Sequence, residues 1–388
     1  MRILVASHTY IVDLNREKLR ALAGLADDIE VTVVVPRRWR PGGVQNKVII
    51  SEPRREERFR LVPVSNFSDH NQALLTFGFD FVRLLRQFKP DIIQVEQGAK
   101  SLAYAQAILL NQLLDLRAKN CFFTWWNLPY RNKFPINWLE GFNLKHTQGA
   151  IAGNQDGADI LRDHGYQGPL KVMPQLGVDE HRFKPQSQPE LAAELGLAPG
   201  EFVVGFAGRF VAEKGILTLI AALTGLTDRP WKLLLLGRGP LRAEIEAQAR
   251  QAGIGDRLVI IESVPHDQVP RYINLMSVLV LPSETTTKVR TLTAVGWKEQ
   301  FGHVLIEAMA CGVPVLGSDS GEIPHVIGKA GLIFPEGDGA ALRDRLQQLL
   351  DNPDYRAGLG RQGHERALQH YTNTALAREQ LAFYQQLR

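Results

Sequence analysis

The sequence predicts an α/β protein with two doubly wound, Rossmann-like domains in tandem. Short, continuously apolar runs alternate with longer amphipathic runs from Ile3 to Phe334, which is typical of parallel strands covered by helices on both faces. The alternation stops in a polar segment with several prolines, residues 174–200, and then starts again. The length of 388 residues suits two or three domains, and a chain that is 45% hydrophobic and 22% charged has the composition of a globular protein.

The first half of the chain carries the first run of this alternation. Strands are expected at residues 3–6, 31–35, 60–64, 91–95, 121–124, 149–152 and 170–173. Helices are expected between them at residues 14–25, 71–88, 100–116, 138–146 and 154–164. We therefore place a first domain at residues 1–173 and a hinge at residues 174–200.

The second half repeats the pattern and ends in helices. Strands are expected at residues 202–207, 232–236, 258–261, 278–281, 313–317 and 332–334. Helices are expected at residues 215–223, 240–252, 268–274, 340–350 and 355–369, with a further one that starts near Gly302. We place a second domain at residues 201–371 and a separate C-terminal helix in residues 372–388. Ligands in such sheets bind at the carboxyl ends of the strands.

Charge is unevenly distributed along the chain. Residues 1–178 hold 23 Lys and Arg against 17 Asp and Glu, and the remainder holds 22 against 24, which gives the net charge of +4. The basic first half suggests an anionic partner such as a phosphorylated acceptor or a membrane surface, although a solvated surface without a partner is equally compatible. We expect a cytoplasmic protein with reduced Cys121 and Cys311, because no apolar run could span a membrane and the N-terminus has the pattern of a strand.

The most informative stretch contains two glutamates eight residues apart, Glu299 and Glu307. On one continuous helix they would point about 80° apart. A helix that starts near Gly302 would instead put Glu299 on the preceding loop and Glu307 in the first two turns, so both could border one cleft. A helix start binds phosphate and carboxylates bind sugar hydroxyls, and a nucleotide sugar offers both groups. The alternative is an amphipathic helix with two incidental glutamates.

A second group of polar residues follows the first strand of the second domain. Gly208-Arg209-Phe210 and Glu213-Lys214-Gly215 stand between that strand and the next helix, which favours phosphate binding. The alternative is a basic loop without a ligand. Gly237 and Gly239 form a similar turn after the next strand, and taken alone they indicate only a turn.

These motifs resemble the donor-binding signature of the family-4 retaining glycosyltransferases of GT-B fold. The resemblance rests on Glu299-x7-Glu307, the run EAMACGVPV, the turn GEIP and the elements around Arg209 and Lys214. It implies an interdomain cleft, a last helix that crosses back to the first domain, a nucleotide-sugar substrate, and neither cofactor nor metal. The implied donor site contains Gly208, Arg209, Lys214, Gly237, Gly239, Val264, Glu299, Phe301, Gly302, His303, Val304, Leu305 and Glu307.

Within that set the resemblance assigns catalytic roles to Glu299, Arg209 and Lys214. Arg209 and Lys214 would neutralise the donor diphosphate as the leaving group gains charge. Glu299 would hold hydroxyls of the donor sugar, and Glu307 would hold the ribose.

The acceptor side is expected in the first domain, where the chain departs from the family pattern. His8 follows the first strand, in a loop that lacks the usual glycine pair, and Trp126-Asn127 stand where many members carry a histidine. Asn154 follows a later strand. Indole rings can stack on sugars and amides can bind hydroxyls, but each of these residues can equally be structural.

The sequence thus predicts a retaining, hexosyltransferase-type enzyme of polysaccharide or glycoconjugate biosynthesis. We expect a UDP- or GDP-type donor and a saccharide or lipid-linked acceptor, with peripheral membrane contact through the basic first domain. A nucleotide-sugar epimerase of the same fold, a glycosyl phosphorylase and a non-catalytic sugar-nucleotide-binding subunit stay open. The chain has no Asp-x-Asp, Walker loop, early GxGxxG or clustered Cys and His, and we expect no nucleic-acid partner. Residues 284–296 form an unusually long connection that we interpret as a lid or a substrate-selecting loop.

Overall fold

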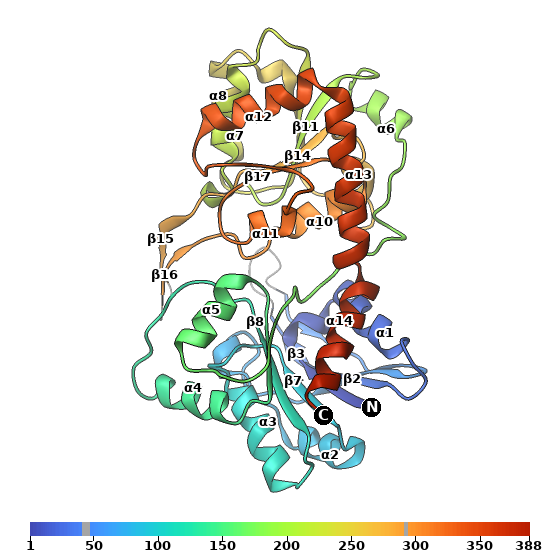
Figure 1. Cartoon of the computed structure of the whole chain (residues 1–388), viewed down its shortest axis with the longest axis vertical. Helices are drawn as coiled ribbons and strands as arrows, with labels where there is room; N and C mark the ends of the chain where they lie inside the picture. Colours follow the sequence, from blue (N-terminus) through green and yellow to red (C-terminus); the bar gives the residue numbers. More distant parts are fainter. Residues whose placement is uncertain (41–46, 291–293) are drawn as a thin grey trace. The chain divides into compact units, whose positions relative to one another are not determined.

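The computed structural model of the chain describes residues 1–40, 47–290 and 294–388. The chain divides into two compact units. Unit 1 contains Met1–Gly177 and the C-terminal Asn373–Arg388, and unit 2 contains most of Val178–Thr372. Each unit is a mainly parallel sheet covered by helices, so the predicted α/β class is confirmed (Figure 1).

Unit 1 is built on a sheet whose described strands follow the order β10-β9-β8-β7-β1-β2-β6-β5. Strand β5 runs antiparallel to β6, and the other neighbours are parallel. The strands are β1 (Arg2–Ala6), β2 (Glu30–Pro36), β5 (Arg54–Glu56), β6 (Phe59–Val64), β7 (Ile92–Val95), β8 (Lys119–Thr124), β9 (Gly149–Ala152) and β10 (Leu170–Val172), with a separate pair β3 (Arg38–Trp39) and β4 (Ile49–Ile50). The helices are η1 (His8–Ile11), η2 (Asp13–Arg16), α1 (Glu17–Ala23), η3 (Gln72–Leu74), α2 (Phe79–Phe88), α3 (Leu102–Leu113), α4 (Ile136–Lys145), α5 (Gln155–Asp163) and α14 (Asn373–Gln386).

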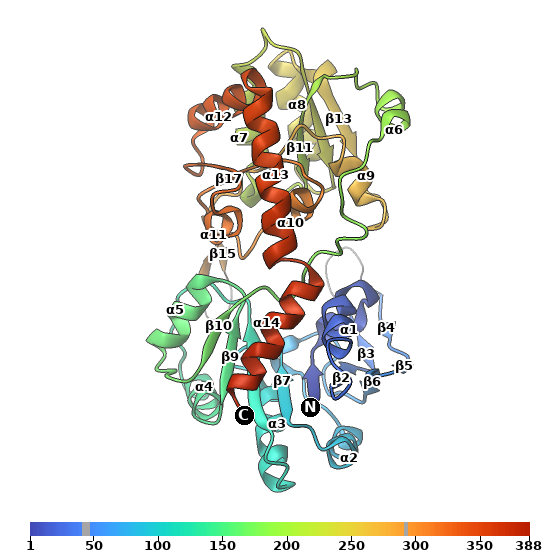
Figure 2. The same cartoon turned by 45° about the vertical axis from the view of Figure 1, so that its right-hand side comes forward.

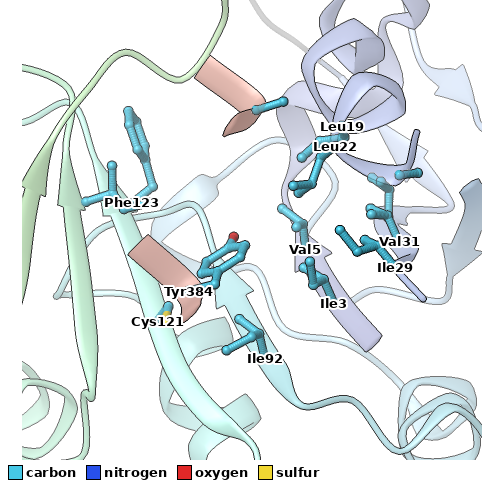
Figure 3. Packing of buried hydrophobic residues seen from close by; sticks show 14 of the residues in the cluster. Ile3, Val5, Leu19, Leu22, Ile29, Val31, Ile92, Cys121, Phe123 and Tyr384 are labelled. Carbon is cyan, nitrogen blue, oxygen red and sulfur yellow. The ribbon is translucent and has the colours of Figure 1, made fainter. Parts of the chain in front are cut away.

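The alternation of side chains along β1 shows why this sheet needs two helical layers. Ile3 and Val5 pack in a cluster with side chains of α1 and with Tyr384 of α14 (Figure 3). Leu4 and Ala6 belong to a second cluster that contains residues of α2 and α3. Each fully buried side chain of this size stabilises the fold by about 1.5–3 kcal/mol. The C-terminal helix α14 lies beside α1 in both views and completes the first layer (Figures 1 and 2).

Unit 2 has a parallel sheet whose described strands follow the order β13-β12-β11-β14-β17-β18. The strands are β11 (Phe202–Ala207), β12 (Trp231–Leu236), β13 (Leu258–Ile261), β14 (Val278–Leu281), β17 (Val315–Ser318) and β18 (Leu332–Phe334). The helices are α6 (Pro189–Glu194), η4 (Ala212–Lys214), α7 (Ile216–Thr224), α8 (Arg242–Gln251), η5 (Gly255–Arg257), α9 (Val269–Ile273), α10 (His303–Ala310), α11 (Ile323–Ile327), α12 (Gly339–Asp351) and α13 (Pro353–His370).

Several expected elements differ in the structure. The prediction of one continuous helix at residues 71–88 is wrong, because the structure has only the short η3 and the separate α2 in that range. The side chain of Gln106 accepts a hydrogen bond from the Phe77 N–H at 2.8 Å and donates one to the Phe77 carbonyl at 2.6 Å. Phe77 also pairs with Asn66 in an isolated antiparallel bridge, so its backbone is extended and α2 begins only after Gly78.

Two segments expected to be irregular contain regular structure. The predicted hinge includes α6, whose Pro189 occupies the first turn, where a missing N–H is tolerated. Part of the long connection at 284–296 forms an antiparallel hairpin of β15 (Thr286–Arg290) and β16 (Val295–Trp297), and residues 291–293 lie outside the described chain. The suggestion that this segment is a lid stays a prediction.

Candidate functional site

Two glycine turns at the carboxyl ends of β11 and β12 pack directly against each other. A Cβ on Gly237 would lie 1.8 Å from the Gly208 carbonyl oxygen, and one on Gly239 would lie 2.3 Å from the Phe210 carbonyl oxygen. The Phe210 N–H donates to the Arg238 carbonyl at 2.9 Å across the same contact. These predicted donor-site glycines therefore have a structural reason, since no side chain fits between the turns.

Lys214 and Glu299 form an ion pair in unit 2, although 85 residues separate them in the chain. Lys214 ends η4, just before the left-handed Gly215, and Glu299 follows β16. The Ser283 hydroxyl donates to the same Glu299 oxygen at 2.8 Å. Glu299 is 7% exposed, so this carboxylate is held between an ammonium group and a hydroxyl with little access to water.

Trp297 covers the ion pair from one side. The Lys214 ammonium lies 5.2 Å from the centre of the Trp297 ring, within cation–π range. The sequence indicated neither Ser283 nor Trp297 as a site residue. Their positions in the chain could have indicated them, because Ser283 stands two residues after β14 and Trp297 ends the hairpin that leads into Glu299.

Helix α10 begins at His303, as the motif predicted, with Gly302 in the left-handed region at φ 80° as its N-cap. The N-cap residue is a glycine and so contributes no side-chain oxygen to the first N–H groups of the helix. The next turn also comes close, because a Cβ on Gly321 would lie 1.9 Å from the Glu299 carbonyl oxygen. The helix start and Glu299 are therefore fixed by backbone packing, which suits the binding of an anion.

Glu307 lies in the second turn of α10 and is 8% exposed. His266, a residue that the sequence did not suggest, places its Nε2 atom 3.4 Å from a Glu307 oxygen. The His266 ring also contacts Phe183, with the ring centres 5.5 Å apart. Val264, in the same loop as His266, is half-buried.

The other predicted donor residues have different surroundings. Arg209 does not join the Lys214 pair: its side chain is 70% exposed, with a guanidinium nitrogen 3.9 Å from Glu213. Phe301 is buried, and its ring contacts the rings of His303 and Tyr371. Leu305 is fully buried and Val304 is half-buried, so Leu305 offers a ligand only its backbone.

In unit 1, His8 starts η1 directly after β1. Its ring lies 4.9 Å from that of Trp39, and burial lowers the pKa of His8 to about 4. Its Nδ1 atom is buried and makes no hydrogen bond among the described residues. His8 is thus a neutral imidazole near pH 7 whose buried Nδ1 atom has no hydrogen-bond partner among the described residues.

Trp126 follows β8, and its indole N–H donates to the Leu128 carbonyl at 2.6 Å. The ammonium of Lys100, which follows β7, lies 4.2 Å from the Trp126 ring centre and 3.5 Å from that of Tyr130. Burial lowers the pKa of Lys100 to about 8 while the charge of Glu140 opposes the shift. Asn127 is buried in the same loop. Trp126 and Asn127 therefore lie in one loop, and the structure places Lys100, which the sequence did not suggest, beside the Trp126 ring.

Asn154 is fully buried, and its side chain is committed to local structure. Its oxygen accepts from the Gly157 N–H at 2.7 Å and caps α5, and its amide nitrogen donates to the Trp125 carbonyl at 3.1 Å. Asn154 therefore stabilises the start of α5 and the loop at Trp125, and its role in acceptor binding stays a prediction.

A buried polar network at the end of β7 was not indicated by the sequence. Glu96 accepts hydrogen bonds from the side-chain amides of Gln94 at 2.7 Å and Gln175 at 2.6 Å. Tyr384 of α14 donates to Gln94 at 2.7 Å. Lys18 of α1 is 2% exposed, and burial lowers its pKa to about 8 although the Glu96 charge favours the ammonium.

Two further properties concern the described ranges as a whole. Within them, no three or more His, Cys, Asp and Glu side chains gather in a way that could hold a metal ion. We also find no helix there with the length and apolar character required to cross a bilayer.

Comparison with known proteins gives consistent matches. Residues 187–366 match the family model of glycosyl transferases group 1. The chain is 31% identical over 329 residues to a 2-deoxystreptamine glucosyltransferase of Streptomyces kanamyceticus, covering 79% of this chain and 82% of that relative. It is 25% identical over 393 residues to the lipopolysaccharide core biosynthesis mannosyltransferase LpsB of Rhizobium meliloti, covering 94% and 99% of the two chains. Other relatives match over about half of their own length.

Solved structures share the fold over the whole chain. The Anabaena protein HepE, in complex with UDP, superposes with a TM-score of 0.68 at 16% identity and covers 98% of both chains. At that identity the similarity concerns the fold, which is that of GT-B glycosyltransferases.

Proposed function

The chain belongs to the glycosyl transferases of group 1 and has the GT-B fold, and from this premise we propose that it is a family-4 enzyme with a retaining mechanism. The proposed reaction moves a hexose from a UDP- or GDP-type sugar to a saccharide or lipid-linked acceptor. The names of the relatives favour such acceptors, since one is named for 2-deoxystreptamine and another for the lipopolysaccharide core. The HepE complex favours UDP as the nucleotide.

The observation that carries this proposal is the Lys214–Glu299 pair beside the start of α10. A diphosphate and a sugar need a cation, backbone N–H groups and a carboxylate within one small volume. In the ligand-free protein the cation and the carboxylate neutralise each other. We propose that the donor separates them, so that Lys214 turns to the diphosphate and Glu299, still bonded to Ser283, accepts from sugar hydroxyls.

Charge development explains why these groups would accelerate transfer. The bond between the sugar and the diphosphate breaks, and the leaving diphosphate gains negative charge in the transition state. Lys214, the α10 start and a reoriented Arg209 would stabilise that charge more strongly than they stabilise the ground state. The Arg209 side chain is exposed, so it can reorient at small energetic cost.

Nucleotide binding and sugar transfer can be tested separately. Thermal unfolding is measured with UDP, GDP, ADP and their sugars for the wild type, Lys214→Ala and Glu299→Ala, since a ligand that binds the native state raises its stability. We expect one nucleotide to stabilise the wild type and to have little effect on Lys214→Ala. Stabilisation of the wild type by none of these nucleotides would contradict the proposed donor site.

Product analysis tests the chemistry itself. We expect release of a nucleoside diphosphate in the presence of an acceptor, and NMR of the product should show the anomeric configuration of the donor. Inversion would contradict the retaining proposal. Turnover of the nucleotide sugar without an acceptor would indicate an epimerase, and binding without turnover would indicate a non-catalytic subunit.

We also propose peripheral contact between unit 1 and anionic lipid, in keeping with a lipid-linked acceptor at the cytoplasmic face of a membrane. Phe134 is 80% exposed and Trp138, in the first turn of α4, is 65% exposed. Arg131, Lys133 and Lys145 of the same segment of the chain are exposed as well. Glu140, the acid of this segment, is buried and bonded to Tyr130, Asn132 and His164. Exposed aromatic side chains and cations in one segment fit the interface of an anionic bilayer.

Vesicle binding tests this contact. Phe134→Ser/Trp138→Ser should reduce cosedimentation with phosphatidylglycerol vesicles by about tenfold. Phe79→Ser removes a similarly exposed aromatic residue of unit 1 and should leave vesicle binding unchanged. Equal binding by all three proteins would contradict the assignment.

A further inference from the structure

A polar cavity lies at the end of the unit 1 sheet opposite to the proposed acceptor residues. Its volume is about 440 Å³, and it is lined by residues next to the amino ends of β1, β7 and β8, among them Arg2, Asp91 and Lys119. Arg2 and Ala6 stand at the two ends of β1, roughly 13 Å apart at the rise of a strand. The cavity is therefore separate from the groups around His8 and Trp126.

The lining is strongly cationic. Arg2, Lys89, Arg117, Lys119 and Arg388 contribute five positive side chains, against the carboxylates of Asp91 and Asp115. Both carboxylates are engaged, because Asp91 accepts from the Arg2 backbone N–H at 2.7 Å and Asp115 pairs with Arg117 at 3.3 Å. Among the described residues, the side chains of Arg2, Lys89 and Lys119 make no ion pair.

Helix ends do not account for this excess of charge. Lys89 and Leu114 are the C-caps of α2 and α3, and α14 ends two residues before Arg388. Each helix C-terminus carries roughly −0.5 of an elementary charge, so three of them attract cations but offset only about half of the side-chain surplus. A bound anion would balance the remainder.

The backbone around the cavity is strained. Lys89, Asp115 and Arg117 have φ values of 47°, 47° and 58°, and they are three of the four non-glycine residues with positive φ in the described ranges. A left-handed conformation costs a residue with a Cβ about 1–2 kcal/mol. Lys89 adopts this conformation as the C-cap of α2, a common way for a helix to end, and Asp115 and Arg117 lie in the connection that follows α3. These conformations place two cations and a carboxylate at the rim of one cavity.

We propose that this cavity binds a small soluble phosphate ester, such as a sugar phosphate, at a site separate from the donor site of unit 2. A cavity of this size suits a ligand of that class. The lining contains leucines and a proline but no aromatic ring, which favours a sugar phosphate over a nucleotide whose base would stack. This inference does not depend on the proposed transferase reaction.

Calorimetric titration with glucose 6-phosphate at low salt tests the proposal. The wild type should bind it, and Lys89→Gln/Lys119→Gln should bind at least about tenfold more weakly. Arg83→Gln, which removes an exposed cation of α2 outside the cavity, should bind like the wild type. Lys214→Ala should also keep glucose 6-phosphate binding, because its defect lies in the other unit. Thermal unfolding of each variant checks that the fold is intact.

Three results would overturn the proposal. The first is the absence of binding heat with the wild type. The second is loss of binding in Lys214→Ala with full binding in the cavity variant, which would place the phosphate in the donor site. The third is binding of phosphatidylglycerol vesicles that depends on Lys89 and Lys119 without any binding of glucose 6-phosphate, which would identify a lipid headgroup as the ligand.

Discussion

The two units assemble their polar groups in different ways. In unit 2, Lys214, Glu299 and the start of α10 are positioned by turns whose glycines touch neighbouring backbone, as at Gly237 and Gly321. In unit 1, Glu96 is bonded to side chains from distant parts of the sequence, including Gln175, which lies in the predicted hinge. Backbone turns leave a local motif in the sequence, whereas a network of side chains does not. Mutations in the two units should therefore affect different properties.

The largest effect is expected at the network of unit 1. Glu96→Ala removes the carboxylate whose charge favours the buried Lys18 ammonium, takes the acceptor from the Gln94 amide, and leaves the Gln175 amide only the Thr9 hydroxyl at 3.4 Å. Leaving a buried donor without its acceptor costs about 1–3 kcal/mol, and more where a charge loses its counter-charge, which should appear in the free energy of unfolding measured with urea.

The double variant Lys18→Met/Glu96→Leu is the matched control. Since apolar side chains of similar volume can replace buried charges of opposite sign, it should regain the part of the stability that Glu96→Ala loses through the uncompensated Lys18 ammonium. A single variant with near-wild-type stability would show that Glu96 and Lys18 are not energetically coupled, and the contrast between the units would weaken.

The next effect is on catalysis in unit 2. Lys214→Ala removes the cation that we assign to the diphosphate, and the loss of one such group reduces kcat by about 100- to 1000-fold. Steady-state kinetics with the donor found by thermal unfolding measure the change. Lys329→Ala, an exposed lysine of the same unit, should have wild-type kinetics. A Lys214→Ala enzyme with normal kcat would remove the principal support for the donor site.

The surroundings of Lys214 and Glu96 also show which parts of each unit could be predicted from the sequence. The spacing of Glu299 and Glu307 predicted a helix start at Gly302, and Gly302 is the N-cap of α10. The motif gave the residue types but not the direction of side chains, so it missed that Arg209 points to Glu213 while Ser283 and Trp297 surround the Lys214 pair. The contacts of Glu96 and His266 depend on tertiary packing, for which a single sequence carries no periodic signal.

The free energy of unfolding should also depend on pH through Lys18, a buried residue of unit 1. The pKa of Lys18 is lowered from 10.5 to about 8, so above pH 8 the folded protein releases a proton that the unfolded chain keeps until about pH 10.5. The unfolded state binds more protons in this window, and stability should therefore rise with pH. Relative to Lys18→Met, the wild type should gain about 3 kcal/mol between pH 7 and 10.5. A constant difference between the two proteins would contradict the assignment.

An added Cβ should disturb the packed glycine turns of unit 2 more than an equal change in a helix of the same unit. Gly237→Ala brings a Cβ to 1.8 Å from the Gly208 carbonyl oxygen, so one of the two turns must move. Such overpacking costs about 1–3 kcal/mol. The control is Gly358→Ala in α13, where the added Cβ meets only a distant arginine nitrogen and should stabilise the helix by about 0.5–1 kcal/mol. Equal effects of the two variants on thermal unfolding would mean that the turn contact is not rigid.

The smallest effect concerns His266, which approaches Glu307 through tertiary packing rather than through a motif. If Glu307 binds the ribose, His266 keeps the carboxylate in place, and Phe183 in turn supports the imidazole. His266→Ala should weaken nucleotide binding by up to about fivefold, since a partly exposed charged contact contributes about 0–1 kcal/mol, and kcat should change little. His266→Gln can still donate to the carboxylate and should recover part of the affinity. If His266→Ala lowered kcat and left nucleotide binding unchanged, His266 would act on the transferred sugar instead, and tertiary packing rather than the motif would supply part of the reactive centre of unit 2.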